Sequence, residues 1–434
     1  MGRIPRREVR LRGPSSRLDI LVLDEEPPYP LNSGKKIRTW CLLQSLALRH
    51  NITYVCYEKN ASPAAKVFAD AGIRLVPVSP RLSEGGARLH ARRLVNLFSR
   101  RPYIVARHDR PSFDRRVREI LETESFDLIQ CEWTPYADLA LRNRGQRDGR
   151  LPVLIATHNI ETDILLRRAL HETSLPRRKY FQAQAQRMER FERSVFASAD
   201  FVVTVSERDE KRAVAWGARR TAVVSNGADT RRIQPTVAQR PKGTELLFVG
   251  ALDWFANIDA IAWFVTKIFP LLRSADPSIH LRVVGSRPHD RVRRLVDGVA
   301  GVTLIGEVED VRPFFARSDV VVVPLRVAGG TRIKILEAMA AGKPLVSTSI
   351  GAEGLEVQHG VHLLLADQPV DFARNVLAFL RTDAFDDLPV RARSLVEERY
   401  RWDLQSRELE RCWLAATAQE TADNIAPLAR ILPA

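Results

Sequence analysis

The residues best suited to chemistry lie together between Gly329 and Lys334. Gly329 and Gly330 form a glycine pair just before an expected helix, where backbone amides can approach an anion and the helix dipole favours negative charge. Arg332 and Lys334 put two cations in the first turn of that helix, although the dipole disfavours positive charge there. A bound phosphate would account for these cations, and a solvated first turn is an equally good interpretation of them.

Glu337 lies two turns from the start of the same helix. One interpretation pairs its carboxylate with Lys334 across the preceding turn. The other makes it an acceptor for two neighbouring sugar hydroxyls, because each carboxylate oxygen can accept a hydrogen bond. A phosphate-binding loop followed closely by a diol acceptor favours a nucleotide site. Thr331 is expected to cap this helix and Gly342 to end it.

A second helix start has the same character. Gly34 follows a short apolar strand and a turn-rich loop, and it opens a helix whose first turns contain Lys35, Lys36 and Arg38. His158 stands at the end of another short strand, from which its side chain would project into a cleft. A lone histidine at a strand end is more often structural than catalytic.

The elements that must position these residues alternate between apolar strands and amphipathic helices. This alternation predicts an α/β fold with parallel sheets and right-handed crossovers. Two such series, joined by a polar linker over 231–243, predict two Rossmann-like domains facing a cleft that binds ligands at the strand ends. The expected boundaries are a disordered basic arm over 1–17, an N-terminal domain over 18–235, a C-terminal domain over 244–400 and a terminal helix over 401–420.

The composition limits the range of functions. The 434 residues carry a net charge of +15, which favours an anionic partner or reflects an arginine-rich composition. The four cysteines lack a CxxC pair, so we expect reduced thiols and no metal site. Without a secretory signal or a membrane-spanning run, we expect a cytoplasmic protein, at most peripheral on a membrane. The segment 88–99 could face a membrane, although a surface helix with its apolar side in the core is favoured.

Five motifs, met in order along the chain, resemble those of the family-four retaining glycosyltransferases, which have the GT-B fold. The motifs are Pro27–Gly34, Thr157–Asn159, Val224–Asp229, Phe248–Gly250 and Gly329–Pro344. The resemblance implies two Rossmann-like domains, with a nucleotide-sugar donor held mainly by the C-terminal domain and an acceptor held mainly by the N-terminal one. It also implies that a last helix, Leu404–Thr417, crosses back to the first domain and that the reaction needs no metal or other cofactor.

Carried over position by position, the resemblance implies roles for single residues. Glu337 would bind the donor ribose and His158 would lie beside the transferred sugar, so these two are the expected catalytic residues. The expected donor-binding residues are Gly34, Gly250, Gly329, Gly330, Thr331, Arg332, Lys334 and Glu337. The expected acceptor-binding residues are Asn159 and Arg38.

Three positions depart from the family pattern. Gly329 stands where the family has the first glutamate of its signature pair, whose usual partner is the donor sugar. Ala251 replaces the arginine that commonly follows Phe-Val-Gly, and the lysine a few residues on is replaced around Ala256–Asn257. In relatives that have both, these cations hold the diphosphate. We therefore expect Arg332 and Lys334 to take that role.

The expected reaction transfers a sugar from a nucleotide diphosphate donor to a hydroxyl of a glycan, lipid or polysaccharide precursor, with retention at the anomeric carbon. Three alternatives stay open: a nucleotide-sugar epimerase of the same fold, a non-catalytic protein that binds an anionic surface or nucleic acid, and a glycosyltransferase made inactive by the departures. No nucleic-acid module is recognisable, so no nucleic-acid partner is expected. A dinucleotide dehydrogenase is disfavoured because no GxGxxG follows the first strand.

Overall fold

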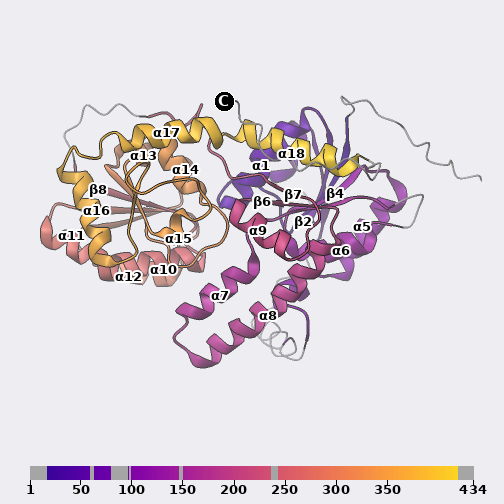
Figure 1. Ribbon diagram of the computed structural model, residues 1–434, viewed down its shortest axis with the longest axis horizontal. Coiled ribbons are helices and arrows are strands. Elements are labelled where there is room, and N and C mark those ends of the chain that lie inside the picture. Colours follow the sequence, from indigo (N-terminus) through magenta and orange to yellow (C-terminus); the bar gives the residue numbers. More distant parts are fainter. Residues whose placement is uncertain are drawn as a thin grey trace, which may run out of the picture.

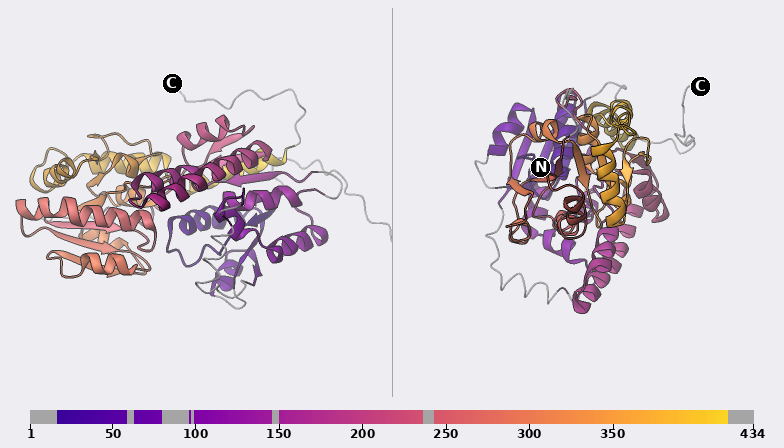
Figure 2. Two further views of the ribbon diagram at one scale, coloured as in Figure 1. Left: turned by 90° about the horizontal axis from the view of Figure 1, so that it is seen from below. Right: turned by 90° about the vertical axis from the view of Figure 1, so that its left-hand side faces the viewer.

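The computed structural model describes residues 17–58, 63–79, 96, 99–145, 150–235 and 243–418. These residues form two lobes, each built on a β-sheet with helices on its faces (Figure 1, Figure 2). The sheet of the N-terminal lobe has the order β3-β2-β1-β4-β5-β6-β7, and that of the C-terminal lobe has the order β10-β9-β8-β11-β12-β13. Neighbouring strands in both sheets pair in parallel, which confirms the predicted pair of Rossmann-like sheets.

The strands are short and mostly buried, as expected where helices cover both faces of a parallel sheet. Those of the first sheet are β1 (Asp19–Leu23), β2 (Asn51–Tyr57), β3 (Ile73–Val78), β4 (Leu128–Cys131), β5 (Val153–Ala156), β6 (Phe201–Thr204) and β7 (Thr221–Val223). Those of the second sheet are β8 (Glu245–Val249), β9 (His280–Val284), β10 (Val302–Gly306), β11 (Val320–Val323), β12 (Leu345–Ser347) and β13 (Leu364–Leu365).

The helices run between these strands. In the N-terminal lobe they are α1 (Gly34–Ala47), α2 (Pro63–Asp70), α4 (Tyr103–His108), α5 (Pro111–Thr123), α6 (Ala137–Asn143), α7 (Glu161–His171), α8 (Leu175–Ser198) and α9 (Glu207–Ala215). Those that follow are α10 (Phe255–Trp263), α11 (Phe269–Ala275), α12 (Asp290–Val296), α13 (Arg312–Arg317), α14 (Ile333–Ala340), α15 (Ser349–Ala352), α16 (Pro369–Arg381), α17 (Leu388–Arg399) and α18 (Trp402–Thr417). Helices α7 and α8 form a hairpin that projects from the body of the molecule (Figure 1).

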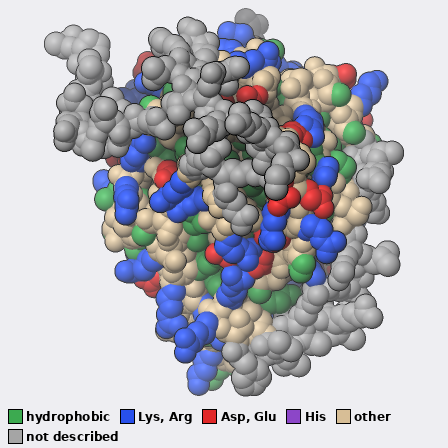
Figure 3. Space-filling model, turned by 90° about the vertical axis from the view of Figure 1, so that its right-hand side faces the viewer, with side chains coloured by type: hydrophobic (Ala, Val, Ile, Leu, Met, Phe, Trp, Pro, Cys, Tyr) green, Lys and Arg blue, Asp and Glu red, His purple; other side chains and the backbone are tan. Residues whose placement is uncertain are grey.

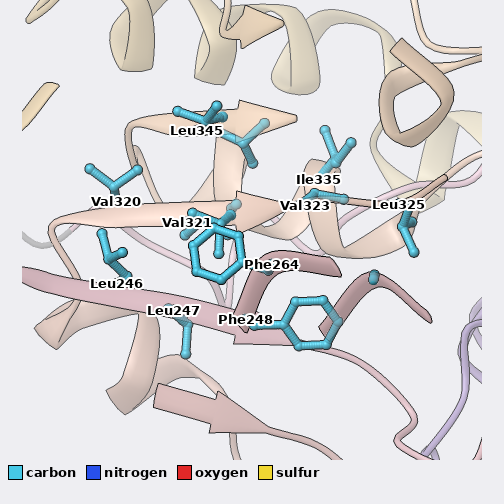
Figure 4. Packing of buried hydrophobic residues seen from close by; sticks show 14 of the residues in the cluster. Leu246, Leu247, Phe248, Phe264, Val320, Val321, Val323, Leu325, Ile335 and Leu345 are labelled. Carbon is cyan, nitrogen blue, oxygen red and sulfur yellow. The ribbon is translucent and has the colours of Figure 1, made fainter. Parts of the chain in front are cut away.

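Strand β11 illustrates why the strands form. It consists of four consecutive valines, each at most 1% exposed, and β-branched side chains suit a strand that is buried on both faces. Phe248 of the neighbouring strand and Phe264 of the helical layer belong to the same core, in which Figure 4 shows Phe264 beside Val321. This packed core fixes the strand ends from which the loops of the cleft depart.

The chain leaves the C-terminal lobe after α17 and returns to the first lobe as α18, which packs on α1. Three of its side chains, Leu409, Cys412 and Trp413, are buried in the core of the N-terminal lobe. The indole Nε1 of Trp413 donates a hydrogen bond to Oε1 of Gln130 in β4. The predicted return of the last helix is therefore confirmed, although the helix begins two residues earlier than expected.

One helical run is unusually long, because α10, a π-helical turn over Phe264–Ile268 and α11 follow one another without a break. Among the described helices, this run (Phe255–Ala275) is the one long and apolar enough to cross a membrane, but 61% of its most apolar window is buried in the core. The basic arm over 1–17 and the helix over 88–99 lie almost entirely outside the described residues.

Candidate active site

A cleft of about 1540 Å³ is lined by residues of both lobes, at the carboxyl ends of the strands. Most of the predicted site residues meet there, although they come from loops far apart in the sequence. Those lining the cleft are Gly34, His158, Asn159, Gly250, Gly329, Thr331, Arg332, Lys334 and Glu337. Gly330 and Arg38 are not among the lining residues. The cleft is large enough for a ligand of drug size or more.

The glycine pair lies against the opposite lobe. A Cβ added to Gly330, which has φ of +62°, would lie 2.2 Å from the carbonyl oxygen of His158. A Cβ added to Gly329 would lie 2.7 Å from a side-chain carbon of Ile164 in α7. A side chain at Gly330 would collide with backbone of the opposite lobe, whereas one at Gly329 would require the side chain of Ile164 to move. The absence of the family glutamate at position 329 is therefore matched by little space for it.

The predicted cap of the α14 helix is wrong. The N-cap residue is Arg332, and no side chain accepts a hydrogen bond at this cap. The hydroxyl oxygen of Thr331 instead accepts a hydrogen bond of 2.8 Å from Nδ2 of Asn226 in the N-terminal lobe. The threonine thus contributes to the contact between the lobes rather than to the helix end.

Arg332 is turned towards its own loop. The residue is only 5% exposed, and its Nη1 donates hydrogen bonds to the carbonyl oxygens of Gly329 and Gly330. Its Nη2 lies 3.4 Å from the carbonyl oxygen of Ile350. Burial lowers the pKa of Arg332 to about 10, so it is still charged at neutral pH. Its guanidinium shapes the glycine loop, which leaves Lys334 as the better candidate for a phosphate.

Lys334 lies where the missing cations would be expected. Its Nζ would lie 2.6 Å from a Cβ on Gly250 and donates a 2.8 Å hydrogen bond to Oδ1 of Asn257. The ammonium also lies 4.6 Å from the ring centroid of Phe248. Burial and the charge of Arg332 lower the pKa of Lys334 to about 7. A bound anion would stabilise the protonated form of Lys334 and so raise its pKa.

Glu337 lies one turn further along α14 and also faces the cleft. The helix-surface pair with Lys334 is not formed, because the lysine donates to Asn257 instead. Burial raises the pKa of Glu337 to about 7, and the charge of Lys334 only partly opposes this shift. Among the described residues this carboxylate has no hydrogen-bonding partner, so it is suited to accept hydrogen bonds from the hydroxyl groups of a ligand.

His158 stands in front of a buried carboxylate that sequence reasoning missed. Its Nε2 lies 3.4 Å from Oε2 of Glu132, which also accepts a 2.8 Å hydrogen bond from the hydroxyl of Thr39. Burial alone would raise the pKa of Glu132, but His158, Thr39 and Arg38 together outweigh it and the pKa lies below its usual range. An ionised Glu132 places a negative charge beside the imidazole, whose Nε2 has no hydrogen-bond partner among the described residues. Glu132 could have been found from the sequence because it directly follows strand β4, and His158 likewise lies at the end of a strand.

Two family models match the chain. One, described as "Glycosyl transferase 4-like domain", matches residues 38–227, and the other, "Glycosyl transferases group 1", matches residues 243–382. The chain belongs to the group 1 glycosyltransferases. The border between the two matches coincides with the connection between the two lobes, and the motifs that carried the resemblance lie on the loops of the cleft.

Curated relatives and solved structures agree with this assignment. An uncharacterized 44.6 kDa protein in the cps region of Klebsiella pneumoniae is 23% identical over 88% of this glycosyltransferase and 96% of its own length. A phosphatidyl-myo-inositol mannosyltransferase of Mycobacterium leprae is 26% identical over 44% of this chain and 52% of its own. Anabaena HepE with UDP and glucose has a TM-score of 0.62 at 16% identity, covering 91% of this chain and 99% of HepE. Sucrose-phosphate synthase of Thermosynechococcus elongatus has a TM-score of 0.68 at 16% identity, covering 92% and 99%. These structures confirm the GT-B fold.

The two residues predicted to contact the acceptor of this glycosyltransferase have other environments. Arg38 is 2% exposed, and its guanidinium donates to the carbonyl oxygens of Val224 and Ser225 at 2.6 and 2.7 Å. It holds the loop after β7 and has no access to a substrate, so the predicted acceptor contact does not fit. Asn159 lines the cleft, but its Oδ1 lies against the glycine pair, 2.9 Å from where a Cβ of Gly330 would be.

Ion pairs join the two lobes beside the glycine loop. Arg167 of α7 forms an ion pair with Glu353 and donates a hydrogen bond to the carbonyl oxygen of Ala328, directly before Gly329. Arg208 of α9 forms a second ion pair with Glu353, at 2.8 Å. These contacts join the glycine loop of the C-terminal lobe to the N-terminal lobe.

Proposed function

We propose that this glycosyltransferase moves a hexose from a nucleoside diphosphate sugar to an acceptor hydroxyl, with retention at the anomeric carbon. The single observation that supports this best is the start of α14. Lys334 and Glu337 lie one turn apart on the cleft, so a cation for the diphosphate and a carboxylate for the ribose diol are presented by one helix. Phosphate binding at a helix start and diol binding by a carboxylate together describe a nucleotide.

The proposed chemistry uses few protein groups. The acceptor oxygen bonds to the anomeric carbon on the face from which the diphosphate departs, which retains the configuration. The diphosphate keeps the electron pair of the broken bond, and its departing oxygen takes the proton of the acceptor hydroxyl. Lys334 and the amides of the glycine loop would stabilise the charge that develops on the diphosphate. Groups of this kind typically contribute about 100- to 1000-fold each in rate. His158, beside the Glu132 carboxylate, would contact the transferred sugar, and the closed lobes would exclude water.

The relatives suggest which substrates to test first. HepE was solved with UDP-glucose and with UDP and glucose, so UDP-hexoses are the first donors, and the named mannosyltransferase adds GDP-mannose. The relative from the cps region supports a glycan or lipid-linked acceptor. On this proposal the protein acts in the cytoplasm, peripheral to the membrane if the acceptor is a lipid, and has no nucleic-acid partner. On the face shown in Figure 3, Lys and Arg side chains are spread over the surface, with Asp and Glu side chains among them.

A thermal-shift panel tests the proposal. The panel contains UDP-glucose, UDP-galactose, UDP-N-acetylglucosamine, GDP-mannose and the free nucleotides. A donor at about 100 times its Kd should stabilise the folded protein by about 2.7 kcal/mol and raise the Tm. A donor that raises the Tm then enters an assay of nucleoside diphosphate release, and NMR of the product reads the anomeric configuration.

The controls separate this function from its alternatives. Glu337→Gln should abolish the shift, whereas Glu119→Gln, on an exposed face of α5, should leave it intact. A product that is still a nucleotide sugar would indicate an epimerase. The proposal fails if no nucleotide or nucleotide sugar changes the Tm, and salt-sensitive binding of duplex DNA in the same preparation would then favour the nucleic-acid alternative.

Independence from metals stays a prediction. Among the described residues, no cluster of three or more His, Cys, Asp or Glu side chains could hold a metal ion. Protein treated with a chelator and then assayed with added Mg²⁺ or without it should have the same rate. A rate restored only by the metal would show that the cation enters with the diphosphate.

A further inference from the structure

A group of polar and aromatic side chains lines the cleft on the N-terminal lobe, apart from the residues assigned to the donor. Trp133 follows β4, and its Nε1 donates a 2.9 Å hydrogen bond to Oε1 of Glu161. The ring of His108 meets the indole edge-on at 5.0 Å between centroids. The ammonium of Lys35 lies 4.9 Å from the centroid of the indole. All four residues line the cleft.

The carboxylates around Trp133 outnumber the positive charges that pair with them. Lys35 is shared by two carboxylates, with Nζ 2.6 Å from Oδ1 of Asp24 and 2.8 Å from Oε1 of Glu25. His108 Nε2 lies 3.9 Å from Oε2 of Glu25, yet burial lowers the pKa of His108 to about 4, so the imidazole is neutral at pH 7. Arginines also line the cleft on this lobe: Arg107 and Arg177 are exposed, and the Arg168 guanidinium lies over the rings of Phe181 and Phe255. The inner wall therefore offers carboxylate oxygens, a neutral imidazole and an indole.

The group is connected to the donor loop through one residue. Glu161 accepts a second hydrogen bond from the side chain of Asn159, whose Oδ1 lies against Gly329 and Gly330. Glu161 itself is held at the start of α7 by Glu192, whose Oε1 accepts a 2.8 Å hydrogen bond from the Glu161 backbone N–H. Trp133 and the glycine loop are thus linked through the side chains of Glu161 and Asn159 along one wall of the cleft.

Resting on the proposed function, we propose that Glu25, His108, Trp133 and Glu161 form the subsite for the acceptor sugar, and that this subsite takes a neutral sugar in preference to a phosphorylated one. The indole offers an apolar surface to the C–H face of a sugar ring. Carboxylates accept hydrogen bonds from hydroxyls, and a neutral imidazole can donate one and accept one. A phosphate in the same place would face the carboxylates of Glu25 and Glu161 with Lys35 already neutralised.

The experiment uses the full-length protein with the donor identified by thermal shift. The probes are octyl β-D-glucopyranoside and octyl β-D-galactopyranoside, each compared with its 6-phosphate. The readouts are the acceptor KM, kcat, the donor KM and donor hydrolysis without acceptor. The wild type should use the neutral glycosides at least about tenfold better, in kcat/KM, than their phosphates.

Three variants assign the preference to the subsite. Trp133→Ala should raise the acceptor KM about tenfold or more and leave the donor KM and the donor-induced Tm shift within about twofold. Trp133→Phe, which keeps a ring but loses the hydrogen bond to Glu161, should have a smaller effect and serves if the alanine variant does not fold. Glu25→Gln should bring the ratio between neutral and phosphorylated acceptors closer to one. Glu119→Gln is the matched control on the surface of the same lobe.

The outcomes that overturn the subsite differ from those that overturn the donor assignment. If the donor binds but no glycoside, neutral or phosphorylated, increases its consumption, the subsite inference is wrong. It is also wrong if Trp133→Ala and Glu25→Gln change donor and acceptor KM equally. A preference for the phosphates that Arg107→Ala removes would overturn the neutral-sugar assignment. Absence of any donor-induced Tm shift in the wild type would instead refute the proposed function.

Discussion

Two helices begin beside the cleft with a glycine and early cations, α1 in the N-terminal lobe and α14 in the C-terminal lobe. In α1 the two lysines have acidic partners: Lys35 is shared by Asp24 and Glu25, and Lys36 Nζ lies 3.1 Å from Oε2 of Glu26. In α14 the partners are uncharged. Arg332 donates to backbone carbonyls, and Lys334 donates to the amide of Asn257.

The preceding loops cause this difference. The loop before α1 brings three consecutive acids, Asp24 to Glu26, whereas the loop before α14 (324–331) contains no acid. The same strand–glycine–helix pattern therefore occurs in two different electrostatic environments. At the start of α1 the lysines are neutralised by carboxylates of the protein, whereas at the start of α14 Lys334 has no carboxylate paired with it among the described residues and could pair with an anionic ligand. Cations at a helix start therefore indicate an anion-binding site only when no acidic residue nearby pairs with them.

The largest difference between the two helix starts is expected when each lysine is replaced by an uncharged side chain. Lys334→Met should lower kcat/KM by about 100- to 1000-fold, because the diphosphate loses its cation in the transition state. Lys36→Met, at the equivalent turn of α1, should change kcat/KM by less than about threefold. Steady-state kinetics with the identified donor measures both. Equal losses in the two variants would show that both helix starts bind the donor.

The two glycines should differ in what they tolerate. Gly330→Ala should destabilise the closed protein by at least about 1–3 kcal/mol, because the residue has positive φ and its Cβ would collide with the His158 carbonyl. In Gly34→Ala the nearest atom to the new Cβ is Ile333 Cδ1 at 3.7 Å, an ordinary contact, so Tm and activity should hardly change. Thermal unfolding and donor affinity measure these effects. An unaffected Gly330→Ala would mean that the lobes do not close on the glycine pair.

Donor affinity should be greatest near pH 7. A bound diphosphate raises the pKa of Lys334 from about 7, so the complex binds a proton more tightly and affinity falls as the pH rises above 7. Ribose hydroxyls stabilise ionised Glu337 and lower its pKa from about 7, so affinity falls as the pH drops below 7. Each limb should approach about tenfold per pH unit. Calorimetric titration between pH 5.5 and 9 should record this profile.

The variants identify the two limbs. Lys334→Met should flatten the alkaline limb and Glu337→Gln the acidic one, each with weaker affinity throughout. An alkaline limb that survives in Lys334→Met would have to come from another group.

The smallest effect is expected at the α1 acids. Glu26→Gln removes the partner of Lys36 in an ion pair whose glutamate is exposed and whose lysine is buried, which should cost about 1 kcal/mol of stability and leave donor affinity unchanged. Chemical denaturation and the donor titration measure both quantities. Tighter donor binding in this variant would mean that the acids of the first loop had been masking a second phosphate site.

Local patterns were enough for the fold. The alternation of apolar strands and amphipathic helices predicted the two parallel sheets, and the glycine pair and Glu337 were found from their types and positions. Long-range partners decided the rest. Arg38 resembled a substrate-binding cation, but the carbonyls it contacts lie 186 and 187 residues later in the chain. Thr331 is of a residue type that often caps helices, but its hydroxyl oxygen accepts a hydrogen bond from Asn226, 105 positions away, instead.

The N-terminal wall of the cleft illustrates the same limit. Trp133 and Glu161 are 28 residues apart, and each alone has the character of an ordinary strand end or helix start. Only the order of β4 and β5 in the sheet brings them together. The sequence gives the order of the strands along the chain, but it does not say which strands are neighbours in the sheet. A subsite assembled from several loops is therefore not apparent in the sequence.

The return of α18 to the first lobe has a consequence for synthesis on the ribosome. Trp413 is fully buried against residues of β4 and the N-terminal core, so that core lacks one of its largest side chains until residues 402–417 have emerged. The C-terminal lobe, whose sheet is complete by residue 365, can assemble before the lobe that precedes it in the chain. The domain translated first is therefore the last to be completed, and the cleft between the lobes takes its final form only then.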